Sequence, residues 1–163
     1  MKIIEFNTKY SEQVKDLLVE LQLYIVGLDE FGLNIITDEF RETYFVNTFN
    51  ELNSHDGKMF LAVSDDRESV FGLICGYIHK YDESDKIDYV CPKTGIVSEL
   101  IISEKYRRMG IGQALIDAIE KYFTDCGCEY SKIDVFAYNK GAKKLYEKNN
   151  YVDRLIPMSK RLG

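Results

Sequence analysis

The chain has 163 residues, of which 45% are hydrophobic, and it carries a net charge of -6. A chain of this size can bury a core without disulfides or metal ions, so we expect a single domain over residues 1–163. The acidic charge, with no basic cluster longer than Lys105 to Arg108, argues against nucleic-acid binding. Because no run approaches the roughly 18 apolar residues of a membrane span, the sequence predicts a soluble, cytoplasmic protein without a membrane partner.

Patterns in the first half predict strands and helices in alternation. Ile3 to Phe6 reads as a short strand, and a helix follows with Ser11 as its cap. The apolar residues of that helix recur at helical spacing: Val14, Leu17, Leu18, Leu21 and Ile25. A second helix is expected over Asp38 to Leu52 with Thr37 as its cap. Lys58 to Asp65 and Val70 to Tyr81 predict a hairpin, with Asp66 to Ser69 as the turn.

The second half continues the alternation. Its expected elements are a strand over Gly95–Ile102, a helix over Gly110–Asp125, a strand over Lys132–Ala137, a helix over Lys140–Asn149 and a strand-like end over Tyr151–Leu162 with a break near Pro157. This order predicts an α/β (α+β) fold in which helices flank a mixed sheet.

The four cysteines indicate free thiols rather than a metal site. Cys75, Cys91, Cys126 and Cys128 lack paired C-x-x-C spacing, and a domain of this length needs no disulfides. A helix that ends at Gly127 explains the Cys126 to Cys128 stretch as well as pairing or metal binding would. We therefore expect no metal.

The run Arg107-Arg108-Met109-Gly110-Ile111-Gly112 lies between a β-rich segment and an expected helix. Free backbone N–H groups and the helix dipole attract phosphate at a helix start, glycines allow close approach, and the two arginines add positive charge. The residues alone leave a second reading open, in which the glycines only relieve crowding between helix and sheet. Leu115 stands where a dinucleotide fingerprint needs glycine, and the Gly-Lys-Ser/Thr of a Walker loop is missing.

Two motifs here resemble the GCN5-related N-acetyltransferases. Arg107-x-x-Gly110-x-Gly112 matches the Q/R-x-x-G-x-G/A signature of that family, and Asn139 to Tyr151 resembles its N-x-x-A-x-x-L-Y-x-K-x-G-F segment. The resemblance covers about Gly95 to Tyr151. Asn150 replaces the usual glycine, and asparagine tolerates the left-handed conformation that glycine would supply. The resemblance implies the family's fold, a mostly antiparallel sheet with a central splayed strand pair, and acetyl-CoA as co-substrate.

The resemblance also implies roles for individual residues. The backbone of Leu100, Ile101 and Ile102 is expected to bind the pantetheine arm at a bulge. The loop is expected to bind the pyrophosphate through the backbone amides from Arg108 to Gln113. The expected pyrophosphate-binding residues are Arg107, Arg108, Met109, Gly110, Ile111, Gly112 and Gln113. Asn139 is expected to contact the CoA arm, although it can equally be the N-cap of its helix.

By the same resemblance, Tyr146 is the expected acid, whose hydroxyl lies near the thioester sulfur and protonates the departing thiolate, although a packing tyrosine also fits its neighbours. An alkylamine, with a pKa of about 10.4, must lose a proton before it attacks. Glu99 is the expected base, Asp134 a weaker candidate, and either carboxylate can instead be an ordinary surface group. Cys75 and Cys91 lack the context of an acyl carrier.

The sequence thus predicts direct acetyl transfer from acetyl-CoA to a primary amine of a small molecule or peptide. The alternative is a non-catalytic acyl-CoA-binding or sensing module. The family's acceptor pocket corresponds to about Leu23–Phe49 and Leu155–Arg161, where aromatic residues such as Tyr24, Phe31, Tyr44 and Phe45 can line a pocket or form core. The resemblance is compatible with a homodimer, and it leaves the acceptor unidentified.

Overall fold

The computed structural model describes residues 1–162, which form a five-stranded sheet between two layers of helices. The strands stand in the order β1 (Lys2–Glu5), β2 (Lys58–Val63), β3 (Val70–Ile78), β4 (Thr94–Ile102) and β5 (Tyr130–Ile133). Neighbours from β1 to β4 pair antiparallel, and β5 pairs parallel with β4. The mixed, mostly antiparallel sheet confirms the predicted fold class.

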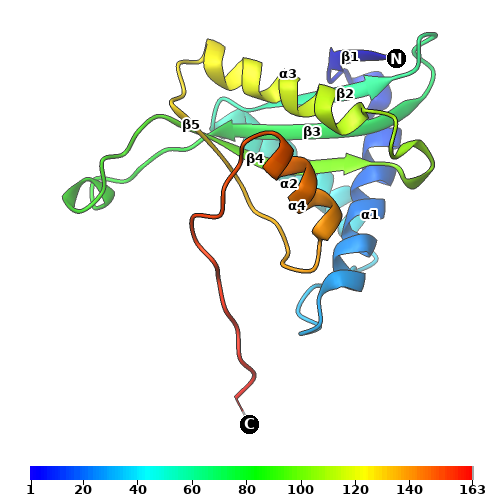
Figure 1. The fold of residues 1–163 in the computed structure, drawn as a ribbon. Helices are drawn as coiled ribbons and strands as arrows, with labels where there is room; N and C mark the ends of the chain where they lie inside the picture. Colours follow the sequence, from blue (N-terminus) through cyan, green and yellow to red (C-terminus); the bar gives the residue numbers. More distant parts are fainter. Residues whose placement is uncertain (163) are drawn as a thin grey trace.

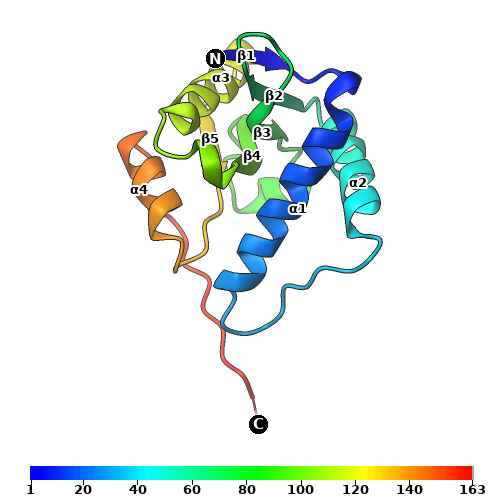
Figure 2. The ribbon, with the colours of Figure 1, turned by 90° about the vertical axis from the view of Figure 1, so that its right-hand side faces the viewer.

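Helices cover both faces of the sheet (Figures 1 and 2). On one side lie α1 (Ser11–Leu28) and α2 (Phe40–Ser54), and on the other lie α3 (Ile111–Asp125) and α4 (Lys140–Lys148). Three short 3-10 helices, Thr8–Tyr10, Asp85–Ile87 and Glu104–Tyr106, lie in the connections. Because strand side chains alternate between faces, β3 contributes Leu73 to the core under α1 and α2, and Ile74 to the core under α3.

β4 and β5 separate partway along their length. Their pairing runs only from Thr94 opposite Tyr130 to Val97 opposite Ile133, whereas β4 continues to Ile102. Its other neighbour, β3, stays paired to that end, with a register shift that places Cys75 opposite Glu99 and Gly76 opposite Val97. One extra residue, Ser98, therefore lies on β4 at this bulge. The backbone after Val97 lacks a strand partner on its β5 side among the described residues.

Glycine and asparagine end two helices as the sequence predicts. Gly127 follows α3 with a φ of 77°, and Asn150 follows α4 with a φ of 64°. At Asn150 the backbone N–H groups of Asn150 and Tyr151 donate to the carbonyls of Glu147 and Tyr146, at 3.0 and 3.1 Å. This is the Schellman arrangement, which satisfies the last carbonyls of a helix.

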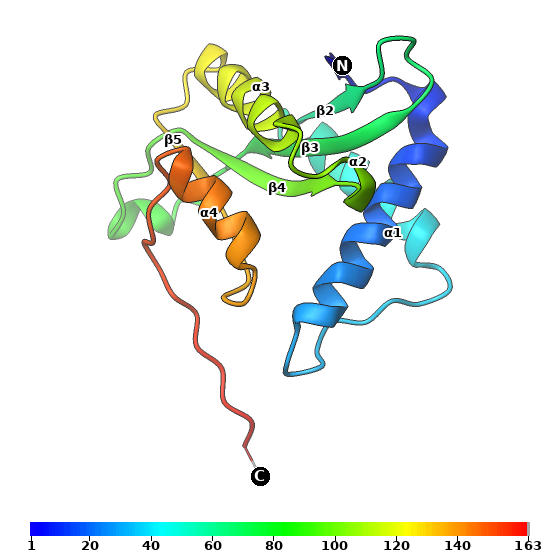
Figure 3. The same ribbon diagram turned by 45° about the vertical axis from the view of Figure 1, so that its right-hand side comes forward.

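Several predicted details are wrong. Neither Ser11 nor Thr37 caps a helix through its side chain: Ser11 is the first residue of α1, and α2 begins only at Phe40. The strand expected over Lys132–Ala137 lies at Tyr130–Ile133 instead. Tyr151–Leu162 forms no strand. Tyr151 packs against the core under α3, and the residues after it run away from the sheet (Figure 3), with Leu155 and Met158 exposed. Strand-like composition alone does not make a strand, because a strand requires a hydrogen-bonded neighbour.

Candidate active site

The loop before α3 leaves the N-terminus of that helix available to an anion. Gly110, the residue before α3, adopts a left-handed conformation with a φ of 78°, and Arg108 does so with a φ of 67°. No side chain in residues 1–162 caps α3, and its first turn contains no acidic residue. Arg107, Arg108 and Met109 are exposed. The first backbone N–H groups of α3 therefore lack a side-chain acceptor and lie beside two cations, an arrangement that suits a pyrophosphate.

Gly112 has a packing role as well. A Cβ there would lie 2.8 Å from a methyl group of Leu145 and 3.3 Å from one of Ile102, so the glycine lets α3 approach α4 and the end of β4. The side chain of Gln113 bonds to Asn149 at the end of α4. Relief of crowding, the second reading of the glycines, thus holds for Gly112, whereas Gly110 has open space around its Cα.

Tyr24 connects the predicted loop to the start of α4. The Arg107 guanidinium lies 5.3 Å from the centre of the Tyr24 ring, and the Tyr24 hydroxyl donates to Oδ1 of Asn139 at 3.3 Å. Asn139 Oδ1 also accepts from the backbone N–H of Ala142 at 3.1 Å, so Asn139 is the N-cap of α4. Arg107 additionally donates to the Ile102 carbonyl at 3.2 Å. α1, the loop and α4 therefore meet near the end of β4.

Glu99 lies on β4 at the bulge and is partly buried. The hydroxyl of Tyr44, on α2, donates a hydrogen bond to its carboxylate. The pKa of Glu99 is raised to about 7 as the net of three effects: burial raises it most, the hydrogen bond from Tyr44 lowers it, and the negative charge of Glu51 raises it. A carboxylate with a pKa near neutrality can accept a proton and release it again under physiological conditions.

Tyr146 is on α4, only 8% exposed, within the core that α3 covers. Its ring centre lies 6.0 Å from that of Tyr151. Burial and, second, the negative charge of Glu99 raise the pKa of Tyr146 to about 12. The structure therefore brings the predicted base and the predicted acid within electrostatic range of each other, and the hydroxyl stays protonated at neutral pH.

Asp134, the weaker candidate for the base, is exposed and follows the end of β5. Together with burial and Glu51, its charge raises the pKa of Tyr77, on β3. No comparable burial surrounds Asp134. Glu99 is thus better suited to proton transfer near neutral pH.

The structure adds residues that the sequence did not single out for these contacts. Tyr44 reaches Glu99 across 55 positions of the chain, and Tyr24 reaches Asn139 across 115. The sequence marked both only as aromatic residues of the expected acceptor segments, which line a pocket or form core. Cys75, by contrast, is fully buried, and burial raises the pKa of its thiol to about 12, which fits the expectation that it carries no acyl group.

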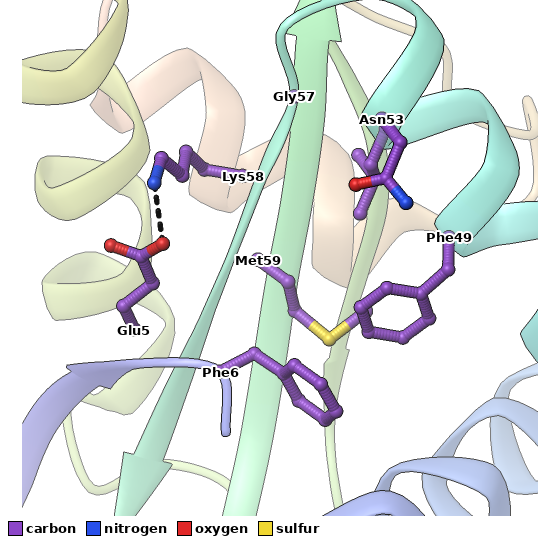
Figure 4. Close-up of a pocket in the computed structure, with 8 residues that line it drawn as sticks. Glu5, Phe6, Phe49, Asn53, Gly57, Lys58 and Met59 are labelled. Carbon is purple, nitrogen blue, oxygen red and sulfur yellow. Dashed lines mark hydrogen bonds and ion pairs between the residues drawn. The ribbon is translucent and has the colours of Figure 1, made fainter. Parts of the chain in front are cut away.

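The segments expected to form the acceptor pocket are only partly packed. Tyr44 and Phe45 contact the core under α1 and α2, whereas Tyr24 and Phe31 are partly exposed. A pocket lined by Glu5, Phe6, Phe49, Leu52, Asn53, Gly57, Lys58 and Met59 lies at the β1–β2 end instead (Figure 4). It contains none of the predicted catalytic or CoA-binding residues, and of the predicted acceptor segments it contains Phe49.

Residues 1–162 contain no group of three or more histidine, cysteine, aspartate or glutamate side chains arranged to hold a metal ion. Over the same residues, no helix is both long and apolar enough to cross a membrane.

Comparisons with known proteins agree with this architecture. Glucosamine 6-phosphate N-acetyltransferase 1 from Dictyostelium discoideum is 24% identical over 135 residues, which cover 82% of this chain and 81% of that protein. A mutant of the BH1408 protein from Bacillus halodurans superimposes with a TM-score of 0.84 at 19% identity, over 99% of both chains. The aminoglycoside N-acetyltransferase AAC(6')-Iy, solved with CoA, gives 0.68 at 17% identity, over 99% of this chain and 100% of that one.

The family model described as "Acetyltransferase (GNAT) family" matches residues 28–151, which include the glycine loop, Glu99 and Tyr146. Members of this family are acyltransferases with an acyl-CoA co-substrate. The match spans most of the chain, and the predicted motifs, the sheet and the fold-level likenesses all agree with it. This chain therefore belongs to the acetyltransferase (GNAT) family and is an acyltransferase enzyme.

Proposed function

We propose that this chain, as a single domain, transfers an acetyl group from acetyl-CoA directly to a primary amine of a small molecule or peptide. The observation that carries the proposal is the pairing of Glu99 with Tyr146. One is a carboxyl group whose pKa is about 7, the other is a protonated phenol, and the negative charge of Glu99 raises the pKa of Tyr146. The free N-terminus of α3, with Arg107 and Arg108 beside it, supports binding of the co-substrate's pyrophosphate.

The chemistry follows from these groups. Glu99 accepts a proton from the ammonium of the acceptor, directly or through water, and the free amine attacks the thioester carbon. The C–N bond forms first and gives a tetrahedral oxyanion. Collapse of this intermediate breaks the C–S bond while Tyr146 donates a proton to the departing thiolate, and the excess proton on the nitrogen passes to the Tyr146 phenolate, directly or through water, so that a neutral amide and CoA thiol leave. Free backbone N–H groups on the unpaired side of β4 after Val97 would stabilise the oxyanion. The acetyl group passes without a covalent enzyme intermediate.

The acceptor class is the finer part of the proposal. The related proteins act on glucosamine 6-phosphate or aminoglycosides by name, both of which present primary amines. The charged group that affects the pKa of Glu99 is Glu51, which is also negative. A cationic amine is attracted to such surroundings, whereas a phosphate is repelled, so we favour an acceptor without a phosphate group.

The test is release of CoA thiol from acetyl-CoA in the presence of a panel of amines: a polyamine, an aminoglycoside, a lysine peptide and glucosamine 6-phosphate. We expect at least one of the unphosphorylated amines to accelerate release well above the rate of hydrolysis. Tight CoA binding with no acceleration by any amine would favour the non-catalytic module instead.

A further inference from the structure

Tyr44 lies on α2 with its ring fixed by packing. It stacks on Phe40, with ring centres 4.6 Å apart and planes 18° from parallel, and it contacts the core under α1 and α2. From this position its hydroxyl donates to Oε1 of Glu99, on β4. The contact joins two elements that are far apart in the sequence, and the ring has little freedom to leave it.

Glu99 lacks a cationic partner. None of the ion pairs within residues 1–162 includes it. The titratable groups that face it are Tyr44 and Glu51 from α2, Cys75 from β3 and Tyr146 from α4. The thiol and both phenols are neutral at pH 7, and Glu51 is negative. The hydrogen bond from Tyr44 is therefore the contact that favours the charged form of Glu99.

We propose that Tyr44 is a positioning residue for amine deprotonation, whose hydroxyl fixes the orientation of the Glu99 carboxylate and favours its ionised form. The inference rests on the proposed function, in which Glu99 accepts the proton of the amine. Only the ionised carboxylate can accept that proton. Loss of the Tyr44 hydroxyl leaves burial and Glu51 unopposed, so a larger share of Glu99 is protonated at neutral pH.

The Tyr44→Phe variant tests this by removing only the hydroxyl. In wild type, kcat/KM should fall below a pH near 7, and in Tyr44→Phe this acid limb should move upward by about one pH unit, because one unit is close to the strength of a hydrogen bond to a charged group. Below both midpoints the variant should be about tenfold slower. At high pH it should approach the wild-type rate.

Tyr10→Phe is the matched control, since the Tyr10 hydroxyl donates to the Arg67 carbonyl at 3.2 Å and lies away from Glu99. It removes a hydroxyl from a buried tyrosine and should leave the pH midpoint unchanged. An unchanged midpoint in Tyr44→Phe, or an equal loss of activity at every pH in a folded variant, would overturn the assignment.

A readout that needs no substrate separates this inference from the proposed function. Carbon-13 NMR of the glutamate carboxyls, with the Glu99 signal assigned by its absence in Glu99→Gln, measures the titration of Glu99 directly. The midpoint should be higher in Tyr44→Phe than in wild type. If wild type acetylates no amine but the midpoint still moves, the proposed function fails and the Tyr44–Glu99 coupling stands. If acetylation proceeds and the midpoint stays fixed, only the coupling fails.

Discussion

The charge of Glu99 on β4 reaches Tyr146 on α4, although Tyr146 and the hydrogen-bond partner of Glu99, Tyr44, pack in different cores. Tyr44, which bonds Glu99, packs against the core under α1 and α2, and Tyr146 belongs to the core under α3. After burial, the negative charge of Glu99 is the second cause of the raised pKa of Tyr146. In the proposed mechanism Glu99 takes up a proton from the amine, so this charge would disappear and Tyr146 would become a stronger acid. Proton uptake at one group thus favours proton donation at the other.

Glu99→Gln should remove the proton acceptor and, at the same time, stabilise the fold at alkaline pH. Burial raises the pKa of Glu99 from about 4.3 when unfolded to about 7 when folded, so the folded state binds more protons between these values. The free energy of unfolding of wild type therefore falls as pH rises from about 4 to 7, by an amount on the order of 3 kcal/mol. Glutamine does not titrate, so the Glu99→Gln variant does not lose this part of the free energy of unfolding.

Urea unfolding of both proteins at pH 5 and pH 8 measures the effect. Glu99→Gln should be the more stable protein at pH 8, with a smaller difference at pH 5, and its kcat/KM should lose the acid limb and fall by about 10²-fold or more. Equal stability of the two proteins at both pH values would contradict the assigned pKa.

Tyr146→Phe should lower kcat with little effect on the amine KM. The phenylalanine ring keeps the packing against Tyr151, so the fold is retained and only the proton donor is lost. We expect a fall in kcat of about 10²-fold, the lower range for loss of a general acid. Steady-state kinetics with an activated thioester provides the control. Its thiolate is a better leaving group than that of CoA and needs less protonation, so its reaction should be less affected by the loss of the hydroxyl. An unchanged kcat with acetyl-CoA would show that Tyr146 is not the general acid.

Gly110→Ala should destabilise the loop through backbone strain rather than a clash. Open space surrounds the Cα of Gly110, but its φ of 78° is unfavourable for any residue with a Cβ. The expected cost is about 1 kcal/mol, measured by urea unfolding, and Gly110→Asn should cost less because asparagine tolerates this conformation. A larger loss for asparagine than for alanine would contradict the left-handed conformation.

Arg108→Gly should have the opposite effect on stability. Arg108 has a φ of 67°, so glycine relieves strain there by about 1 kcal/mol while it removes a cation beside the start of α3. We expect a higher urea midpoint together with weaker CoA binding by calorimetry. Binding of pantetheine, which lacks the pyrophosphate, should be unchanged. Equal weakening of both ligands would place the arginine's role elsewhere.

The sequence predicted much of the fold because local patterns specify its elements. Helical spacing located α1 and α3, and the turn chemistry at Gly127 and Asn150 located two helix ends. The family resemblance also selected Glu99 and Tyr146, and in the structure the charge of Glu99 raises the pKa of Tyr146.

What the sequence missed depends on contacts between distant segments. The Tyr44–Glu99 hydrogen bond requires a side chain of α2 to reach β4, and the sequence marks Tyr44 only as an aromatic residue of pocket or core. The expected C-terminal strand failed for the same reason, because Val152, Leu155 and Ile156 resemble strand residues and yet lack a neighbouring strand within residues 1–162.

The most direct test of the account follows an isotopically labelled acetyl group from acetyl-CoA by mass spectrometry, with wild type, Glu99→Gln and Tyr146→Phe, and an amine from the panel that accelerates thiol release. The account predicts that the label appears on the amine nitrogen, in stoichiometry with released CoA, and much more slowly in both variants. Label that appears only as free acetate, or that accumulates on the protein, would contradict direct transfer to an amine.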